Sequence, residues 1–418
     1  MMQTDDPTRP ERTTPLWKNR DYMLLWSGQT VSIIGTHVSQ IAFPLLVLAL
    51  THSPAQAGFV AAARSLPYLL FTLLAGALVD RWDRKVTMIV CSALSAIALA
   101  SIAVAAAFGS LTIAQLVIVS FVEGTCAVFF RLAETSALPQ VVSKAQLPAA
   151  IAQQQAQYAV GAIAGPPLGG ALYSTAQLLP FVVDACSYAA SCLSLTAIRT
   201  RFQAARTAVR RSLRAEIGEG VAWLWRHALI RYMAFLTGGI NFITAGAALL
   251  VIVLAAQQGA SAALTGAIFA AAGAGGILGA VIAPLLQRRL SFGQLIIGAC
   301  WCYALVWALL PAAATPALLM VLVSGASLAS LVYDTVQMSY RLALIPDGLQ
   351  GRVNSVFRLV ADGSKTLGVA ATGILLESLG TTSTILISAV LLAALATLTL
   401  LNRHVRAAPP QTALKSSF

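Results

Sequence analysis

Charge is scarce in this sequence. Only 10% of its 418 residues are charged, against roughly 25% in soluble domains, and 58% are hydrophobic. A water-soluble globular fold is therefore close to excluded. A bilayer-spanning helix needs about 20 residues, so about a dozen such helices would use roughly 240 residues, a little over half of the chain.

The motifs of metal and enzyme sites are also missing. The six cysteines lie in apolar stretches and form no CxxC or Cys/His cluster, so we expect all of them to be small, buried packing residues. The sequence contains no HExxH, no GxSxG in a strand-turn-helix setting and no phosphate-binding loop with its lysine. We therefore predict no enzymatic activity, no metal site, no cofactor and no ATP-driven step.

We also expect no cleavable leader. The first twenty residues are polar and charged, and the apolar run from Tyr22 to Leu50 is too long for a signal-peptide core. No small-residue cleavage site follows that run. We expect the first span to stay in the mature protein.

Hydropathy and turn residues divide the chain into twelve candidate spans. These cover residues 22–50, 56–80, 86–108, 111–135, 147–174, 178–198, 231–256, 261–286, 292–312, 316–341, 352–378 and 381–402. Backbone in hydrocarbon must satisfy its own hydrogen bonds, so each span is expected to be a helix. The predicted fold is an all-α polytopic membrane protein with twelve transmembrane helices in two six-helix bundles. Its parts are an N-terminal tail (1–21), an N-terminal bundle (22–198), a basic linker (199–230), a C-terminal bundle (231–402) and a C-terminal tail (403–418).

Basic residues are distributed very unevenly over the connections between the spans. Of the 27 lysines and arginines, 23 lie in the two tails, the linker and the other connections on the same side, and the opposite connections carry none. The positive-inside rule then places both termini in the cytoplasm and requires an even number of spans. The excess of 27 basic over 15 acidic residues reflects this topology, so we expect no nucleic acid partner.

The linker shows helical periodicity. Leu213, Ile217, Val221 and Leu224 recur on one face, opposite several arginines, which indicates an amphipathic helix on the anionic inner leaflet. A solvated basic tether that only sets orientation is the alternative.

An internal duplication is visible as a repeated offset of 203 residues. This offset relates Gly76 to Gly279, Gly165 to Gly368 and Gly170 to Gly373. The repetition supports two halves of parallel topology, which is one of the known plans of secondary carriers.

A signature loop follows the second span. The segment from Gly76 to Lys85 has a glycine, an acid four residues later and a basic pair after a short turn, and it resembles the signature loop of the major facilitator superfamily. Asp83 stands where the superfamily often has glycine, and this resembles the subgroup of siderophore (enterobactin) and macrolide exporters. The counterpart from Gly279 to Arg289 has Ala283 where the acid would stand.

This resemblance implies a cytoplasmic gate that latches the two halves together. Asp80, Arg84 and Glu134 would form it, and Arg131 and Asp334, which the same offset relates, would contribute. The alternative is that the basic residues of the loop only set topology. A turn from Leu344 to Asn354 resembles the same exporter subgroup.

The fifth span combines small residues with a helix breaker. The residues Gly161, Gly165, Pro166, Gly169 and Gly170 resemble the span-five motif of the superfamily's antiporters. Small residues let helices approach closely within the membrane, and proline removes a backbone hydrogen bond. Close packing alone would also account for the glycines.

Several charged residues lie at bilayer depth, where each costs roughly 3 kcal/mol on insertion scales and normally faces a bundle interior or a wet cavity. A proton-driven carrier needs a carboxyl group that binds a proton in one state and releases it in another. Glu123 is the first candidate for this role, with Asp362 and Asp184 behind it. We expect His37, Gln40, Arg64, Arg358 and Lys365 to line a substrate cavity.

On the eleventh span the polar residues form one stripe. Asn354, Arg358, Asp362 and Lys365 follow at steps of four, four and three, which places them on one helical face. Asp362 and Lys365 can pair as a neutralised couple, which would be a structural role, or they can bind substrate or protons.

The sequence thus predicts a secondary transporter of the major facilitator type in the cell membrane. By resemblance it would export a small amphipathic molecule, such as a drug, siderophore or natural product, in exchange for protons. A proton-coupled importer and a membrane sensor or scaffold are the alternatives. The expected partners are the substrate, protons and the lipid bilayer, and we expect a monomer.

Overall fold

The computed structural model describes residues 15–79, 81–143, 145–203, 213–346 and 349–408. All the regular secondary structure in these ranges is helical. The N-terminal half contains α1 (Arg20–Thr51), α2 (Pro54–Val79), α3 (Arg84–Ala107), α4 (Ile113–Val141), α5 (Leu147–Thr175) and α6 (Leu179–Ala197). The linker contains α7 (Leu213–Arg226).

The C-terminal half repeats this plan. It contains α8 (Ala228–Thr244), α9 (Ala247–Gln257), α10 (Ala262–Gln287), α11 (Phe292–Leu309), α12 (Pro316–Leu344), α13 (Gln350–Leu401) and a short α14 (Arg403–Arg406). Within α13, Gly380 has φ 77° and ψ 174°, so two helices meet there at a sharp bend. Only glycine adopts this conformation readily, which explains the break that was expected between the last two spans.

Among the described residues, nine helical segments are long and apolar enough to cross a membrane, which makes the chain a multi-pass membrane protein. In this count the bent α13 is one segment, and α8 and α9 together are one segment. The total of twelve spans stays a prediction.

Side-chain caps fix where several helices begin. Asp83 accepts a hydrogen bond from Val86 N at the start of α3, and Thr112 accepts one from Gln115 N at the start of α4. Ser291 and Gln294 form a reciprocal capping box on α11. These side chains satisfy amide groups that a helix leaves unpaired in its first turn, so the polar residues in the turns decide the boundaries.

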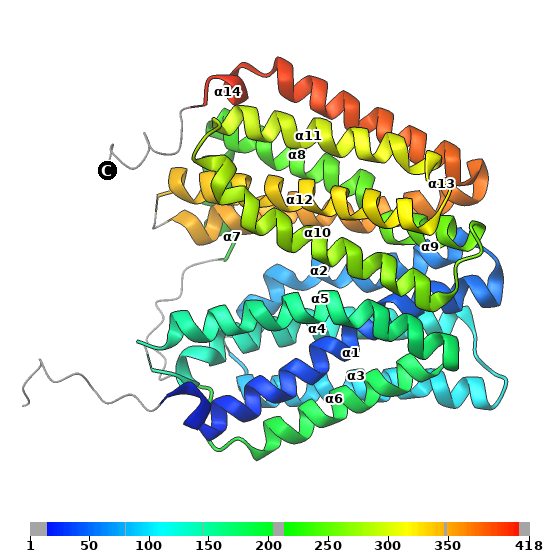
Figure 1. Ribbon diagram of the computed structural model, residues 1–418. Helices are drawn as coiled ribbons and strands as arrows, with labels where there is room; N and C mark the ends of the chain where they lie inside the picture. The colour runs from blue at the N-terminus through cyan, green and yellow to red at the C-terminus, as the bar shows by residue number, and fades with distance from the viewer. Residues whose placement is uncertain (1–14, 80, 144, 204–212, 347–348, 409–418) are drawn as a thin grey trace, which may run out of the picture.

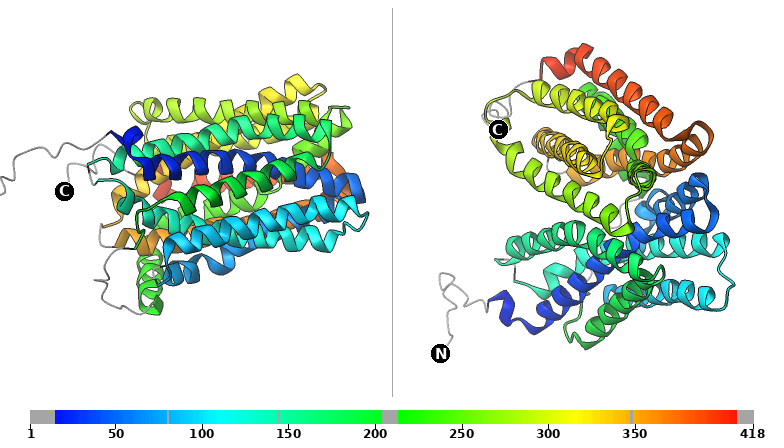
Figure 2. Two further views of the ribbon diagram at one scale, coloured as in Figure 1. Left: turned by 90° about the horizontal axis from the view of Figure 1, so that it is seen from below. Right: turned by 45° about the vertical axis from the view of Figure 1, so that its right-hand side comes forward.

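The two halves form separate bundles that lie one above the other in Figure 1, with their long helices running in roughly the same direction (Figures 1 and 2). The first residues of α1 and the last residues of α13 lie at the same end, here called the terminal end. This agrees with an even number of crossings. The opposite end, here called the far end, carries the turns at Thr51–Pro54, Thr175–Leu179 and Gln257–Ala262.

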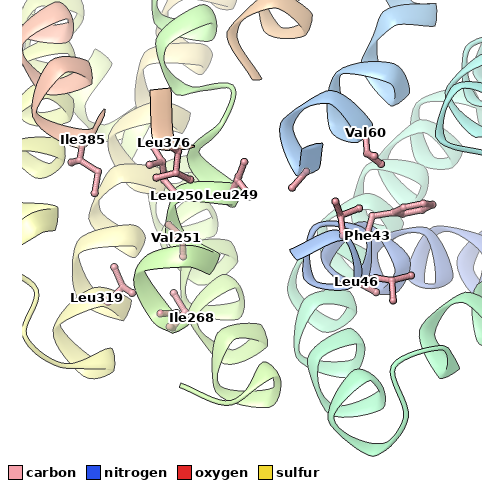
Figure 3. Packing of buried hydrophobic residues seen from close by; sticks show 14 of the residues in the cluster. Phe43, Leu46, Val60, Leu249, Leu250, Val251, Ile268, Leu319, Leu376 and Ile385 are labelled. Atoms are coloured by element: carbon pink, nitrogen blue, oxygen red, sulfur yellow. The ribbon is translucent and has the colours of Figure 1, made fainter. Parts of the chain in front are cut away.

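Buried apolar side chains join the two halves at the far end only. One hydrophobic cluster contains Phe43, Leu46 and Val60 from the N-terminal half together with Leu250 and Ile268 from the C-terminal half (Figure 3). Toward the terminal end each half has a cluster of its own among the described residues. The molecule is therefore closed at the far end.

Helix α7 occupies the predicted amphipathic segment and runs across the direction of the long helices (Figure 2). Part of its apolar face packs against the C-terminal half. Leu224 is buried in the cluster of the C-terminal half, and Gly220 lies against the backbone of Arg352 on α13. Val221 and Trp225 remain exposed, so only part of the apolar surface is free to contact a leaflet.

Two cysteines differ from the expectation that all six are buried. Cys186 on α6 and Cys302 on α11 are exposed, whereas Cys91, Cys126 and Cys300 are buried and Cys192 is partly buried. The expectation was wrong for the two exposed residues because an apolar stretch in a membrane helix includes its lipid-facing surface.

Candidate functional site

A buried ion pair links α2 and α4 in the N-terminal half. Arg64 Nη2 lies 2.6 Å from Glu123 Oε1, with the Glu123 side chain 1% exposed and that of Arg64 22% exposed. Gly124 makes the pair possible, because a Cβ there would overlap the backbone carbonyl of Arg64. The second carboxylate oxygen of Glu123 has no hydrogen-bond partner among the described residues.

A second buried carboxylate lies close by on α6. Asp184 is fully buried, and its Oδ1 accepts a hydrogen bond of 3.0 Å from Ser187 Oγ. Its Oδ2 is buried without a partner in the described part of the chain. Gly35 lets α1 pack directly on this pair, since a Cβ there would overlap Ser187 Oγ.

Arg64 is near enough to both Glu123 and Asp184 to interact with each electrostatically. Arg64 therefore contacts one buried carboxyl group, that of Glu123, and lies within electrostatic range of a second, that of Asp184. An isolated buried charge is expensive, so a proton on one of the carboxyl groups would reduce the cost. The orphaned oxygens Glu123 Oε2 and Asp184 Oδ2 are where that proton could sit.

A cavity of about 150 Å³, whose lining includes many side chains with polar groups, lies beside these residues within the N-terminal half. Its lining includes His37, Arg131 and three tyrosines, Tyr68, Tyr158 and Tyr188. Gln40 is exposed and hydrogen-bonds His37, but it does not line this cavity. His37 and Arg64 are close enough to interact electrostatically, which places the cavity next to the ion pair.

The C-terminal half has a larger and mainly apolar cavity of about 290 Å³. It is lined by leucines and valines together with Tyr303, Trp307 and Ser330. The sequence analysis did not predict this cavity, because the sequence does not distinguish an aromatic residue that packs in an apolar span from one that lines a cavity.

In the polar stripe of α13, Arg358 and Lys365 are exposed, whereas Asn354 and Asp362 are partly buried. Asp362 contacts Lys365 at 3.0 Å and Arg358 at 3.5 Å, so the predicted couple is confirmed as part of a three-residue group. Neighbouring Gly363 lies against Leu69 of α2, which places this part of α13 at the boundary between the halves. Asp334 on α12 is exposed and within electrostatic range of Asp362 and Lys365.

Two of the residues proposed for the cytoplasmic gate, Arg84 and Glu134, have partners within the N-terminal half. Arg84 Nη1 donates hydrogen bonds of 3.1 Å to the carbonyls of Ser136 and Phe202. Glu134 is buried and hydrogen-bonds Gln154, and Arg131 is exposed. Asp80 lies outside the described residues. Toward the terminal end the buried apolar clusters of the two halves are separate among the described residues, and the latch stays a prediction.

The small residues of α5 serve two interfaces. Gly161, Gly165 and Gly169 face α1, where added Cβ atoms would overlap or crowd Ile33, His37 and Val38. Pro166 and Gly170 face α10 of the other half, against Gly266 and Ala262.

Glu377 is an inter-half contact that sequence reasoning missed. It lies on α13 just before the bend at Gly380, at the far end of the molecule. It accepts hydrogen bonds from the amide of Ala55 at 3.0 Å and from Ser53 Oγ. The available signal was its offset of 203 residues from Ser174, which also contacts the other half.

Residues 13–416 match the family described as transmembrane secretion effector. The chain belongs to this family of major facilitator transporters. The transporter is similar to the multidrug efflux pump Tap of Mycolicibacterium fortuitum, with 26% identity over 380 residues that cover 87% of this chain and 91% of that protein. It is 29% identical over 162 residues to macrolide efflux protein A of Streptococcus pyogenes, which covers 39% of this chain and 40% of that protein.

Solved structures show the same fold. The transporter aligns with the inward-facing state of a bacterial homologue of the iron transporter ferroportin with a TM-score of 0.73 and 14% identity, over 93% of this chain and 99% of that one. An outward-facing state of such a homologue gives 0.60 and 15% identity, over 91% and 98%.

Proposed function

We propose that the transporter exports a small amphipathic molecule from the cytoplasm in exchange for protons. It would lie in the cell membrane with both termini in the cytoplasm. The single observation that carries the proposal is the buried ion pair of Arg64 with Glu123, with the buried carboxyl group of Asp184 within electrostatic range. The described part of the C-terminal half has no such group at the equivalent positions, because Ala267, Ala326 and Ile387 stand there.

The cycle follows from this arrangement. With the far end closed, the cytoplasmic side is open and substrate enters from there. A bound proton on Glu123 or Asp184 leaves to the cytoplasm, and the freed carboxylate then pairs with Arg64. Once the far end opens, the carboxyl group takes a proton from outside and releases Arg64, so that one direction of substrate movement requires the opposite movement of protons.

The two cavities support an amphipathic cargo. The N-terminal cavity offers hydroxyl, imidazole and guanidinium groups, and the C-terminal cavity offers aliphatic and aromatic surface. A molecule with one polar and one apolar part would find matching surface in each half. The names of the efflux pumps similar to this chain support the outward direction and a drug or natural product as cargo.

The polar stripe on α13 bears on the charge of the cargo. Arg358 and Lys365 outnumber Asp362, so this face carries a positive excess, which suits an anionic group on the cargo. A proton-coupled importer of an anionic solute is the second candidate that this feature supports.

Accumulation of a labelled macrolide in cells with and without the transporter tests the proposal. We expect lower accumulation with the transporter and loss of that difference when a protonophore is added. Glu123→Gln should abolish the difference, whereas Glu219→Gln, which changes an exposed carboxylate on α7, should preserve it. Export that persists with the protonophore would refute proton exchange, and export that persists with Glu123→Gln would refute Glu123 as the proton carrier.

A further inference from the structure

The far end holds a pair of contacts built alike in the two halves. Helices α2 and α10 are related by the internal duplication, and each begins after a serine that caps its third residue. Ser53 accepts from Gln56 N and Ser261 accepts from Leu264 N, both at 3.2 Å. Each helix thus satisfies one of its first amide groups from within its own half.

The amide of the second residue is satisfied by the other half. Ala55 N on α2 donates to Glu377 on α13 at 3.0 Å, and Ala263 N on α10 donates to Ser174 Oγ on α5 at 3.1 Å. Ser53 Oγ adds a further hydrogen bond to Glu377. The two acceptors, Ser174 and Glu377, are related by the offset of 203 residues that runs through the duplication.

Glycines bring the backbones together at these same points. Gly170 and Gly373 share the offset as well, and each faces the first residue of the opposing helix. A Cβ on Gly373 would lie 2.8 Å from the carbonyl oxygen of Pro54, and one on Gly170 would overlap the carbonyl of Ala262. The contacts are therefore part of a close interface that repeats about the pseudo-twofold axis.

We propose that these hydrogen bonds form a latch that holds the far end closed, and that Glu377 is the positioning residue that sets its strength. Every donor and acceptor across the latch belongs to different halves, so all of these bonds must break when the far end opens. The two inter-half contacts, at Glu377 and at Ser174, differ in strength. The carboxylate of Glu377 meets the positive end of the α2 dipole, whereas Ser174 offers α10 only a neutral hydroxyl.

The functional consequence concerns which side of the membrane the resting transporter faces. A strong bond on one side of the pseudo-twofold axis biases the molecule toward the closed far end without any ligand. This inference rests on alternating access from the proposed function, but not on proton coupling or on the identity of the cargo.

The distance between spin labels at the far end tests the latch. Labels at Ser110→Cys and Ala314→Cys, on exposed far-end turns of the two halves, are introduced together with Cys186→Ser and Cys302→Ser in the full chain. Pulsed electron paramagnetic resonance is recorded in proteoliposomes without substrate and without a pH gradient. We expect a dominant short distance in the parent protein.

Glu377→Ala should raise the long-distance population about tenfold, since it removes two hydrogen bonds to a charged group. Ser174→Ala should raise it about threefold, and Glu377→Gln should fall between the parent and Glu377→Ala because its amide oxygen still accepts. Ser378→Ala is the matched control, because its hydroxyl bonds only its own helix at the carbonyls of Ile374 and Leu375. If Glu377→Ala is not monodisperse, Ser53→Ala replaces it with the same expected direction.

An unchanged distance distribution in Glu377→Ala, or an equal change in Ser378→Ala, would overturn the latch. Because the readout needs neither protons nor cargo, failure of the latch would leave proton-coupled export standing. Conversely, a transporter that proves not to be proton-coupled would still show the distance change.

Discussion

Gly124 lies directly against the backbone of Arg64, and the residue before it, Glu123, binds the guanidinium of that same arginine. One glycine thus sets the separation of α2 and α4 at the point where a buried charge pair must form. The chemistry of the site depends on this packing, because a carboxylate that loses contact with its cation in a dry bundle is strongly destabilised.

Gly124→Ala should lower the free energy of unfolding of the transporter. The new Cβ would overlap the carbonyl of Arg64, and overpacking of this kind costs about 1–3 kcal/mol. Thermal unfolding of purified protein checks this, with Gly298→Ala as the control, since a Cβ at Gly298 on α11 meets open space. Equal melting temperatures for the two variants would show that α2 and α4 do not pack as described.

Removal of one partner of the ion pair should cost more than removal of both. Arg64→Ala leaves Glu123 buried and unpaired, a loss of about 3–5 kcal/mol. The combined Arg64→Ala and Glu123→Ala variant should recover part of that loss, because no uncompensated charge remains. Unfolding free energies of the two single variants and the double variant form the test, and strictly additive losses would mean that the pair does not interact.

Substitution of Gly165 should separate α1 from α5. A Cβ at this position would overlap the Cβ of His37, so Gly165→Ala is expected to displace His37 in the N-terminal cavity and to reduce export severalfold. Gly298→Ala is the control on α11, where the added atom meets nothing within contact distance. Initial rates of drug efflux measure the effect, and parallel rates in the two variants would count against a role for this packing.

Neutralising Asp362 should change selectivity and leave stability almost untouched. The group is exposed, so the ion pairs with Arg358 and Lys365 contribute within about 1 kcal/mol to folding. Asp362→Asn would leave two unbalanced cations at the boundary between the halves, and the KM for an anionic fluorescent probe should fall a few-fold relative to a cationic one. Identical KM ratios in wild type and variant would place the stripe outside the substrate path.

Sequence reasoning foresaw the elements well, because their signals are local. The span of α5 was expected at 147–174 and is found at Leu147–Thr175, since Pro148 marks its first turn and a backbone turn at Ala176 ends it. The break between α8 and α9 was not foreseen. Gly246 there packs against Thr372 on α13, a contact between distant parts of the chain that no local pattern records.

The candidate site was foreseen as residues but not as contacts. Glu123, Asp184 and Arg64 stand out because charges are rare at bilayer depth, yet Arg64 was expected to line the substrate cavity and is bound to Glu123. Their pairing depends on how α2, α4 and α6 pack. Glu377 did not stand out in this way, because it lies at the end of a predicted span, where acidic residues are common.

Substrate-driven proton movement in proteoliposomes tests the central claim most directly. With a pH-sensitive dye trapped inside and no imposed gradient, a transported drug supplied on one side should drive protons toward that side in wild type. The signal should vanish in Glu123→Gln, while Glu219→Gln keeps it. Drug movement without any change of internal pH in the wild-type transporter would contradict the account.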